Sequence, residues 1–163
     1  MTKNYRRRDV LKTFSRLASG AALFGMPMPA FAAIKGVMYK NPTCSCCETY
    51  GAYLEKNGFK LEIKPTNDLA QVSTSLGVPA KLQGCHTIVV GNYLFVGFVP
   101  IEHIQKMSAE MPKIKGLAMP GMPMGIPNMG FPLMAGMEQQ TYETYAFTTD
   151  GKEPFVYGTY PES

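Results

Sequence analysis

The residues with the most distinctive chemistry are four cysteines, three of which fall within four positions. Cys44, Cys46 and Cys47 are close together, and Cys85 follows later in the chain. Because Cys44 and Cys47 are three residues apart, their sulfurs lie on one side of a helix N-terminus. The unpaired N–H groups there favour the thiolate, which is both a nucleophile and a metal ligand. The pair alone fits a redox dithiol as well as a metal site, and the two extra cysteines favour a metal.

The spacing also bears on the kind of metal site. Cys46 lies about 100° around the helix from Cys47, so it cannot easily share a mononuclear site with both of its neighbours. A structural zinc ion would require two well-separated ligand pairs, which this chain lacks. Iron–sulfur ligation by four cysteines gains little support from two adjacent ones. We therefore expect a cluster with bridging sulfurs, held by Cys44, Cys46, Cys47 and Cys85.

Methionine is a second source of sulfur. Six methionines lie between positions 119 and 137: Met119, Met122, Met124, Met129, Met134 and Met137. Thiolate and thioether are soft ligands, which select Cu(I) over calcium, magnesium or manganese. For any one of these methionines, adaptable packing is the more common role. His86 follows Cys85 directly and is a better ligand candidate than His103, which we expect to face solvent or core.

The elements that position these residues follow from hydrophobic periodicity and from Pro and Gly. We expect strands over 34–40 and 59–63, a helix from 42 to 57, a helix over 67–76, a hairpin over 87–99 and a helix from 100 to 107. This order, with Cys-x-x-Cys at the first strand-to-helix junction, resembles the thioredoxin-like α/β fold, a central mixed sheet flanked by helices. In that fold Cys85 would face Cys44 and Cys47.

The chain after about residue 111 differs in character. Over 119–137, Pro and Gly recur every few residues, so neither helix nor strand can persist there, and we expect a Met/Pro/Gly-rich loop that extends over 112–140. The segment 141–160 alternates around Asp150-Gly151, which predicts a C-terminal β-hairpin. We expect 33–163 to form a single domain that includes the loop.

Residues 1–32 have the three parts of an export signal: a basic head, an apolar stretch and a small-x-small cleavage pattern at Ala30-Phe31-Ala32. The head contains Arg7-Arg8-Asp9-Val10-Leu11-Lys12, which resembles the twin-arginine signal. An uncleaved anchor is the alternative, and Gly and Pro in the stretch weaken it. We expect removal after Ala32, no stable membrane insertion afterwards, and a periplasmic protein, whose thiols tend to be oxidised or metal-bound.

The charge distribution excludes one class of function. The 131 residues after Ala32 carry ten Lys, no Arg and eleven acidic residues, so the net charge there is −1. A nucleic-acid-binding protein gathers Lys and Arg on one face to neutralise phosphates. We therefore expect no nucleic-acid partner.

Three motifs together resemble the CopG-like copper-resistance family, small exported metal-binding proteins. They cover 39–47 (Tyr-Lys-Asn-Pro-Thr-Cys-Ser-Cys-Cys), 84–87 (Gly-Cys-His-Thr) and 116–125 (Gly-Leu-Ala-Met-Pro-Gly-Met-Pro-Met-Gly), and the likeness extends from about 37 to 150. The resemblance implies a thioredoxin-like fold and a multinuclear, sulfur-bridged copper cluster. It matches all four cysteines to family positions, together with Met122 and Met129.

The sequence departs from this family at two places. It has Gly97-Phe98-Val99-Pro100 where relatives usually carry Gly-His-Val-Pro, and Gly125-Ile126-Pro127-Asn128-Met129 where they carry Gly-Ser-Pro-Gly-Met. Any role of that histidine is therefore lost here or taken by another group. Metal count and redox behaviour can differ accordingly.

Together these observations predict a periplasmic copper-binding resistance protein, a metal-binding protein rather than an enzyme. Several Cu(I) ions would be bound per chain by the four cysteines, supplemented by His86, Met119, Met122, Met124 and Met129. Its partners would be copper ions and other periplasmic copper-handling proteins. Its role would be the storage, transfer or redox conversion of copper. The alternative is a thiol–disulfide oxidoreductase that uses Cys44 and Cys47. The region before the third strand argues against it, because Cys85-His86 stands where oxidoreductases carry proline.

Overall fold

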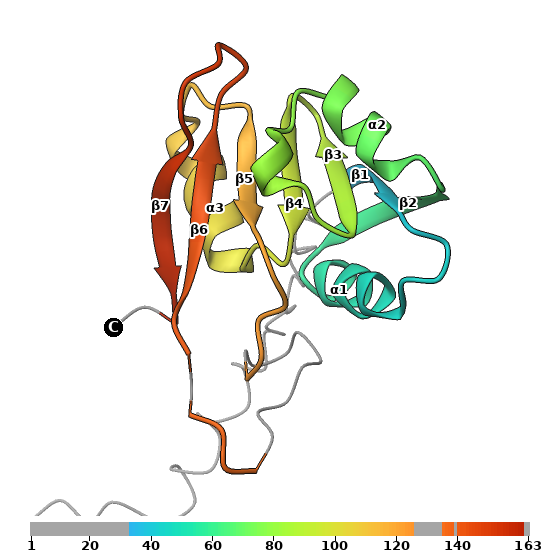
Figure 1. Ribbon diagram of the computed structural model, residues 1–163, viewed down its shortest axis with the longest axis vertical. Helices are drawn as coiled ribbons and strands as arrows, with labels where there is room; N and C mark the ends of the chain where they lie inside the picture. The colour runs from blue at the N-terminus through green and yellow to red at the C-terminus, as the bar shows by residue number, and fades with distance from the viewer. Residues whose placement is uncertain (1–32, 126–134, 139, 162–163) are drawn as a thin grey trace, which may run out of the picture. The chain divides into compact units, whose positions relative to one another are not determined.

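The fold is built on a seven-stranded mixed sheet with the strand order β2-β1-β3-β4-β5-β6-β7 (Figure 1). The computed structural model describes residues 33–125, 135–138 and 140–161. The strands are β1 (Ile34–Lys40), β2 (Phe59–Pro65), β3 (His86–Val90), β4 (Tyr93–Gly97), β5 (Gly116–Met119), β6 (Tyr142–Phe147) and β7 (Phe155–Tyr160). The helices are α1 (Ser45–Lys56), α2 (Leu69–Ser75) and α3 (Ile101–Glu110), with a 3₁₀ turn η2 (Ala80–Leu82).

Two neighbouring pairs of strands are parallel and the others are antiparallel. β1 runs parallel to β2 and β4 parallel to β5, whereas β3 is antiparallel to both β1 and β4, and β6 is antiparallel to both β5 and β7. This confirms the predicted α/β class with a mixed sheet and the predicted order of the first seven elements. The thioredoxin-like classification stays a prediction.

Helices cover both faces of the sheet. Successive residues of a strand point to opposite faces, so one strand can pack against both helical layers. On one face, Phe95 and Leu117 join the main core with the buried residues of α1 and α3. On the other face, Leu94, Val96 and Ala118 pack with the residues around η2. The strands are therefore apolar on both sides in the middle of the sheet, as expected for a sheet that lies between two layers.

The predicted loop over 112–140 is wrong at its start, where the structure has strand β5. All four residues of Gly116–Met119 are buried, and β5 lies between β4 and β6. A run of four apolar residues that is buried on both faces shows no alternation, so its sequence does not reveal the strand. A Cβ on Gly116 would lie 2.2 Å from the carbonyl oxygen of Leu94, so the close pairing with β4 requires glycine here.

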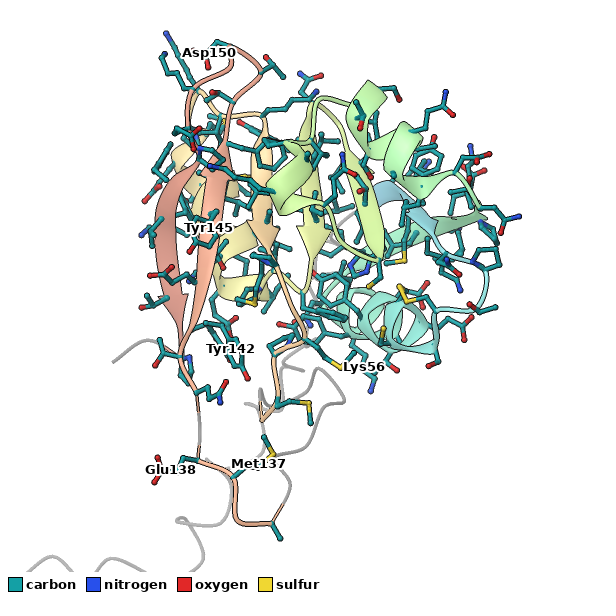
Figure 2. All side chains as sticks on the ribbon, in the orientation of Figure 1. Lys56, Met137, Glu138, Tyr142, Tyr145 and Asp150 are labelled. Atoms are coloured by element: carbon teal, nitrogen blue, oxygen red, sulfur yellow. A yellow bond between two sulfur atoms is a disulfide. The ribbon has the colours of Figure 1, made fainter. Side chains whose placement is uncertain are left out.

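The C-terminal segment forms the edge of the sheet beyond β5. β6 pairs with β7 in antiparallel register, with an irregularity between Thr144 and Tyr145. Figure 2 shows Tyr142 and Tyr145 on β6 and Asp150 on the connection to β7. The hydroxyl of Tyr142 donates to the carbonyl of Met124 and accepts from its N–H, at 3.1 and 2.8 Å. This contact ties the described start of the Met-rich segment to β6.

Replacing Met111 by glycine is expected to stabilise the protein by about 0.5–1 kcal/mol. Met111 ends α3 with φ 44° and ψ 53°, a left-handed conformation that disfavours any residue with a Cβ. Its side chain is 73% exposed, so little burial is lost. Urea unfolding measures the change. The matched Met111→Ala variant keeps a Cβ and should gain nothing, and equal stabilities of the two variants would contradict the argument.

Candidate metal centre

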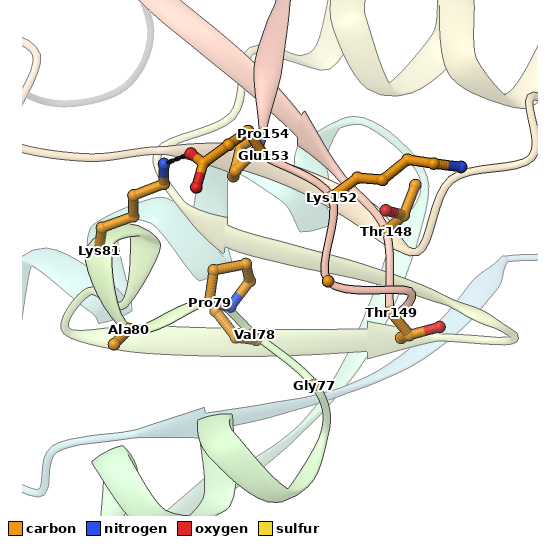
Figure 3. A pocket seen from close by; sticks show the side chains of 11 residues that line it. Gly77, Val78, Pro79, Ala80, Lys81, Thr148, Thr149, Lys152, Glu153 and Pro154 are labelled. Atoms are coloured by element: carbon orange, nitrogen blue, oxygen red, sulfur yellow. Dashed lines mark hydrogen bonds and ion pairs between the residues drawn. The ribbon is translucent and has the colours of Figure 1, made fainter.

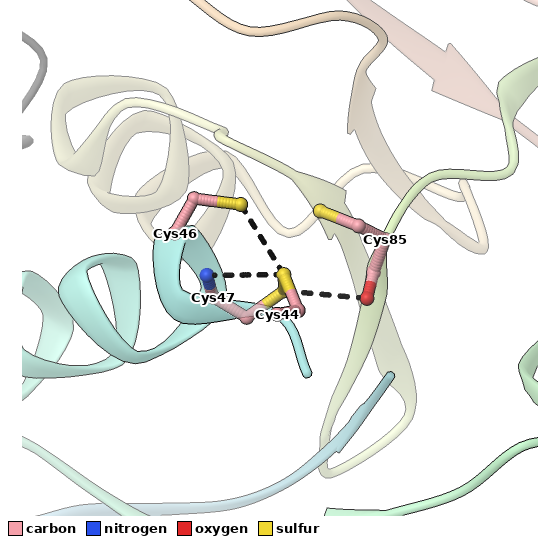
Figure 4. Close-up of side chains that lie close together, drawn as sticks. All are labelled: Cys44, Cys46, Cys47 and Cys85. Atoms are coloured by element: carbon pink, nitrogen blue, oxygen red, sulfur yellow. Dashed lines mark hydrogen bonds between the residues drawn. A yellow bond between two sulfur atoms is a disulfide. The ribbon is translucent and has the colours of Figure 1, made fainter. Parts of the chain in front are cut away.

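The start of α1 holds three of the four cysteines that are predicted to bind metal. Cys44 is the N-cap residue of α1, and its sulfur accepts the N–H of Cys47 at 3.3 Å. The helix begins two residues after Thr43 because the Asn41 side chain accepts the Thr43 N–H and closes a separate turn. Cys44 and Cys47 form a disulfide bond, and the Cys46 sulfur lies 3.2 Å from that of Cys44 (Figure 4).

The sheet brings Cys85 to this helix end. β1 and β3 pair antiparallel with Lys40 opposite His86, so the residues after β1 and the residues before β3 leave the sheet at the same edge. The Asn41 N–H donates to the carbonyl of Cys85 at 3.3 Å. The predicted approach of Cys85 to Cys44 and Cys47 is confirmed, because all four cysteine sulfurs lie within 4.8 Å of one another.

Burial differs among the four sulfurs. Cys47 is fully buried, whereas Cys44, Cys46 and Cys85 are partly exposed. Burial, together with the nearby Cys46 thiol, raises the pKa of Cys85 to about 11. A metal binds the thiolate, so the Cys85 proton must leave before this sulfur can act as a ligand.

His86 points one ring nitrogen toward the sulfurs. Its Nε2–H donates to the carbonyl of Gly97 at 2.9 Å, and because a carbonyl can only accept, the tautomer with the proton on Nε2 is fixed. Nδ1 is then without a proton and lies 3.5 Å from the Cys85 sulfur. Burial lowers the pKa of His86 to about 4, so the ring is neutral at physiological pH. His86 Nδ1 can accept a hydrogen bond from the Cys85 thiol or be offered to a metal.

Aromatic rings fix the imidazole from the core side. Tyr50 stacks on His86 with ring centroids 5.0 Å apart, and Phe98 meets His86 edge-on at 5.3 Å. The Tyr50 hydroxyl donates to the carbonyl of Val99 at 2.7 Å. Phe98 thus contributes an apolar wall beside His86.

Lys40 is a site residue that sequence reasoning missed. Its side chain is only 4% exposed, and Nζ donates to the carbonyls of Asn41, Pro42 and Cys44 at 3.3–3.4 Å and to a Glu48 carboxylate oxygen at 3.1 Å. Three of these acceptors belong to the turn that carries Cys44. Its place directly before the cysteine motif was the only sequence signal, because a lysine at a strand end is normally solvated.

Replacing Lys40 by methionine is expected to lower the free energy of unfolding by about 2–4 kcal/mol. Three backbone carbonyls lose a charged donor, and their hydrogen bonds are stronger than neutral ones. Thermal or urea unfolding of the oxidised protein measures the loss. Glu48→Gln is the matched control: Glu48 is 69% exposed, so removing the ion pair alone should change stability by less than about 1 kcal/mol. Equal losses in the two variants would refute the role of the carbonyl contacts.

The candidate methionines are spread over different environments. Met119 is buried in the main core at the end of β5, whereas Met122 is 50% exposed and Met124 is half-buried. Met119 pairs with Gly97, whose carbonyl holds His86, so the Met-rich segment leaves the sheet at the edge where the cysteines lie. Met129 and the predicted signal 1–32 lie outside the described residues.

The other predicted histidine has a structural place. His103 is buried in α3, and its Nδ1 lies 2.8 Å from the Thr144 hydroxyl oxygen on β6. Its ring also meets Tyr157 edge-on, at 6.2 Å between centroids. His103 therefore lies in the core, which is one of the two places expected from the sequence.

One pocket of about 530 Å³ lies away from the cysteines, between the residues around η2 and the β6–β7 connection (Figure 3). Its two lysines are each ion-paired, Lys81 with Glu153 and Lys152 with Asp150. No cysteine lines this pocket. This pocket is therefore separate from the cysteine cluster at the start of α1.

Comparisons with known proteins fit this geometry. A family model described as a protein of unknown function, DUF411, matches residues 82–129, which include Cys85 and His86. No protein in the curated set matches significantly. Among solved structures, copper resistance protein CopG in Form 1 is 32% identical with a TM-score of 0.67, covering 80% of this chain and 99% of its own. Form 2 has the same identity and TM-score, with 79% and 99% coverage.

Among the described residues, no helix has the length and apolar character needed to cross a membrane. The two structural matches span nearly the full length of the solved protein at over 30% identity. The cysteine motif, the approach of Cys85 and these matches support one another. The chain belongs to the CopG family of copper resistance proteins.

Proposed function

We propose that the protein binds several Cu(I) ions in the periplasm through Cys44, Cys46, Cys47 and Cys85 and acts in copper resistance. The observation that carries the proposal is the gathering of four cysteine sulfurs within 4.8 Å. Cysteine sulfur is a soft ligand that selects Cu(I), and thiolates can bridge neighbouring ions. The solved relatives are named as copper resistance proteins, which supports copper as the metal.

Each residue has a defined part in this proposal. The disulfide bond occupies two of the four sulfurs, so the site gains its full set of thiolates only after two electrons reduce Cys44 and Cys47. Lys40 holds the turn that carries Cys44, and His86 offers Nδ1 beside Cys85. Met119, Met122, Met124 and Met129 would supplement or shield the bound copper.

The location and partners form the finer part of the proposal. The twin-arginine-like segment 1–32 would direct export and be removed, leaving 33–163 as the periplasmic domain. Other periplasmic copper-handling proteins would exchange copper with it. Storage, transfer and redox conversion of copper all require the same thiolate site.

The direct test is copper content after anaerobic reduction and reconstitution with excess Cu(I). We expect more than one copper ion per wild-type chain and none in the variant with all four cysteines changed to serine. Ser45→Ala is the matched control, because it alters the same turn and keeps every sulfur. Copper retained by the four-serine variant, or none bound by the wild type, would reject the proposal.

A thiol–disulfide oxidoreductase is the second candidate, favoured by the disulfide bond at the N-terminus of α1. The two functions separate in a variant that lacks Cys46 and Cys85. An oxidoreductase of this type keeps its insulin-reducing activity in that variant, because Cys44 and Cys47 suffice. A copper-cluster protein binds fewer copper ions and binds them more weakly there, and it shows no such activity.

A further inference from the structure

Two cysteines of the cluster lie outside the disulfide bond and form a pair of their own. Cys46 comes from the first turn of α1 and Cys85 from the bend before β3, and their sulfurs lie within 4.8 Å of each other. Figure 4 shows their sulfurs pointing toward each other across the gap between α1 and the chain before β3. Both residues are free thiols and partly exposed, unlike the buried Cys47, so a small oxidant in solution can reach them.

The side chains of Cys46 and Cys85 allow the sulfurs to come closer. A disulfide bond requires an S–S distance of about 2.05 Å, so the two side chains must move together from their present separation of at most 4.8 Å. Cys85 lies in a bend rather than in a helix or strand, and its carbonyl is held by the Asn41 N–H, so the approach falls mainly to rotation of the two side chains. The other close contact, between Cys46 and Cys44 at 3.2 Å, can only exchange one disulfide bond for another and leaves the number of thiols unchanged.

We propose that Cys46 and Cys85 are a second redox pair, which closes a disulfide bond beside Cys44–Cys47. With a small-molecule disulfide as oxidant, one cysteine attacks an oxidant sulfur, forms a mixed disulfide and releases one thiol. The other cysteine then attacks the protein sulfur of that mixed disulfide and releases the second thiol. Two protein thiols lose two electrons and two protons, and the oxidant takes up both as its two thiols.

The consequence for copper rests on the proposed function. The site has three states, with four, two or no thiols, according to whether none, one or both disulfide bonds are closed. Only thiolates bind Cu(I) strongly, so the second disulfide bond removes the last two strong sulfur ligands. The number of Cu(I) ions that the site can hold thus falls in two steps. Each step removes two electrons from two thiols as one disulfide bond closes.

Peptide mapping after oxidation with glutathione disulfide tests this pairing. Trypsin places Cys44, Cys46 and Cys47 in peptide 41–56 and Cys85 in peptide 82–106. The Cys44–Cys47 bond lies within the first peptide, so only a bond to Cys85 joins the two. We expect the joined peptides in the wild type, together with the loss of both alkylatable thiols and a higher melting temperature, because the new bond constrains the unfolded chain.

Single variants identify the sulfur that bonds to Cys85. Cys46→Ser and Cys85→Ser each keep the first disulfide bond, and we expect no joined peptides in either. Joined peptides in Cys46→Ser would show that Cys44 or Cys47 bonds to Cys85 and would overturn the proposal. Stable glutathione adducts on wild-type Cys46 or Cys85 without joined peptides would also overturn it.

The copper measurement separates this proposal from the function on which it rests. If the reduced wild type binds copper and the joined peptides never form, the second pair is rejected and the copper site stands. If the joined peptides form and the reduced protein binds no copper, the redox pair stands and the copper function fails. If the joined peptides form and the reduced protein binds copper, the protein with both disulfide bonds closed should bind no Cu(I).

Discussion

Reduction of the Cys44–Cys47 disulfide bond is expected to tighten Cu(I) binding by at least about 100-fold. The oxidised site offers two free thiols, Cys46 and Cys85, and the reduced site offers four sulfurs within 4.8 Å. Loss of a group that merely supports a ligand already weakens metal binding about 10–100-fold, and here two ligands themselves are restored. Competition with a Cu(I) chelator, under anaerobic conditions and with thiols counted in each sample, measures the change.

The control for this prediction removes the disulfide bond without removing the other pair. The double variant Cys44→Ser, Cys47→Ser keeps Cys46 and Cys85 and has no bond at this position to reduce. With Cys46 and Cys85 as thiols, its Cu(I) affinity should match that of the wild type with only the Cys44–Cys47 bond closed, and it should not respond to mild reductant. Equal affinities of the oxidised and reduced wild type would mean that Cys44 and Cys47 are not copper ligands.

Replacing Gly97 by alanine is expected to destabilise the protein by at least about 3 kcal/mol. Gly97 ends β4 with φ +69°, where a Cβ is disfavoured by about 1–2 kcal/mol. The added Cβ would also lie 2.3 Å from the carbonyl oxygen of Met119, its partner on β5. Backbone cannot yield as a flexible side chain can, so β5 must separate from β4. Urea unfolding measures the loss, and failure to obtain folded protein would be its extreme form.

Gly91 is the matched control for Gly97, because it shares the left-handed backbone but not the close contact. Its φ is +56°, and nothing lies within 4 Å of where its Cβ would stand. Gly91→Ala should therefore show the conformational penalty alone, about 1 kcal/mol. A loss in Gly97→Ala within 1 kcal/mol of that in Gly91→Ala would show that the contact with Met119 is relieved without strain.

Gly97 also links the stability of the sheet to the metal centre. Its carbonyl accepts the Nε2–H of His86 and so fixes which ring nitrogen faces Cys85. The next residue, Phe98, packs edge-on against the ring of His86. His86 is therefore a nitrogen close to the sulfurs that is held from two sides, by a backbone carbonyl and by aromatic rings.

Much of the fold could be predicted from local sequence. The alternation over 34–40, the Asn57-Gly58 stop after α1 and Pro100 before α3 each act within a few residues, and the structure has elements at these places. β5 was missed because its strand character comes from pairing with β4 and β6 rather than from its own four residues. Short buried strands are the elements that local patterns identify least well.

The sequence by itself determined the sulfur chemistry, because residues three apart at a helix N-terminus share one side whatever surrounds them. Cys85 was expected near them only through the likeness to a known fold. The tertiary structure decided the rest: how closely Cys85 approaches the start of α1, and, through the Gly97 carbonyl, which ring nitrogen of His86 faces Cys85. These contacts depend on how β1, β3 and β4 pair, and strand pairing joins residues whose proximity no local pattern specifies.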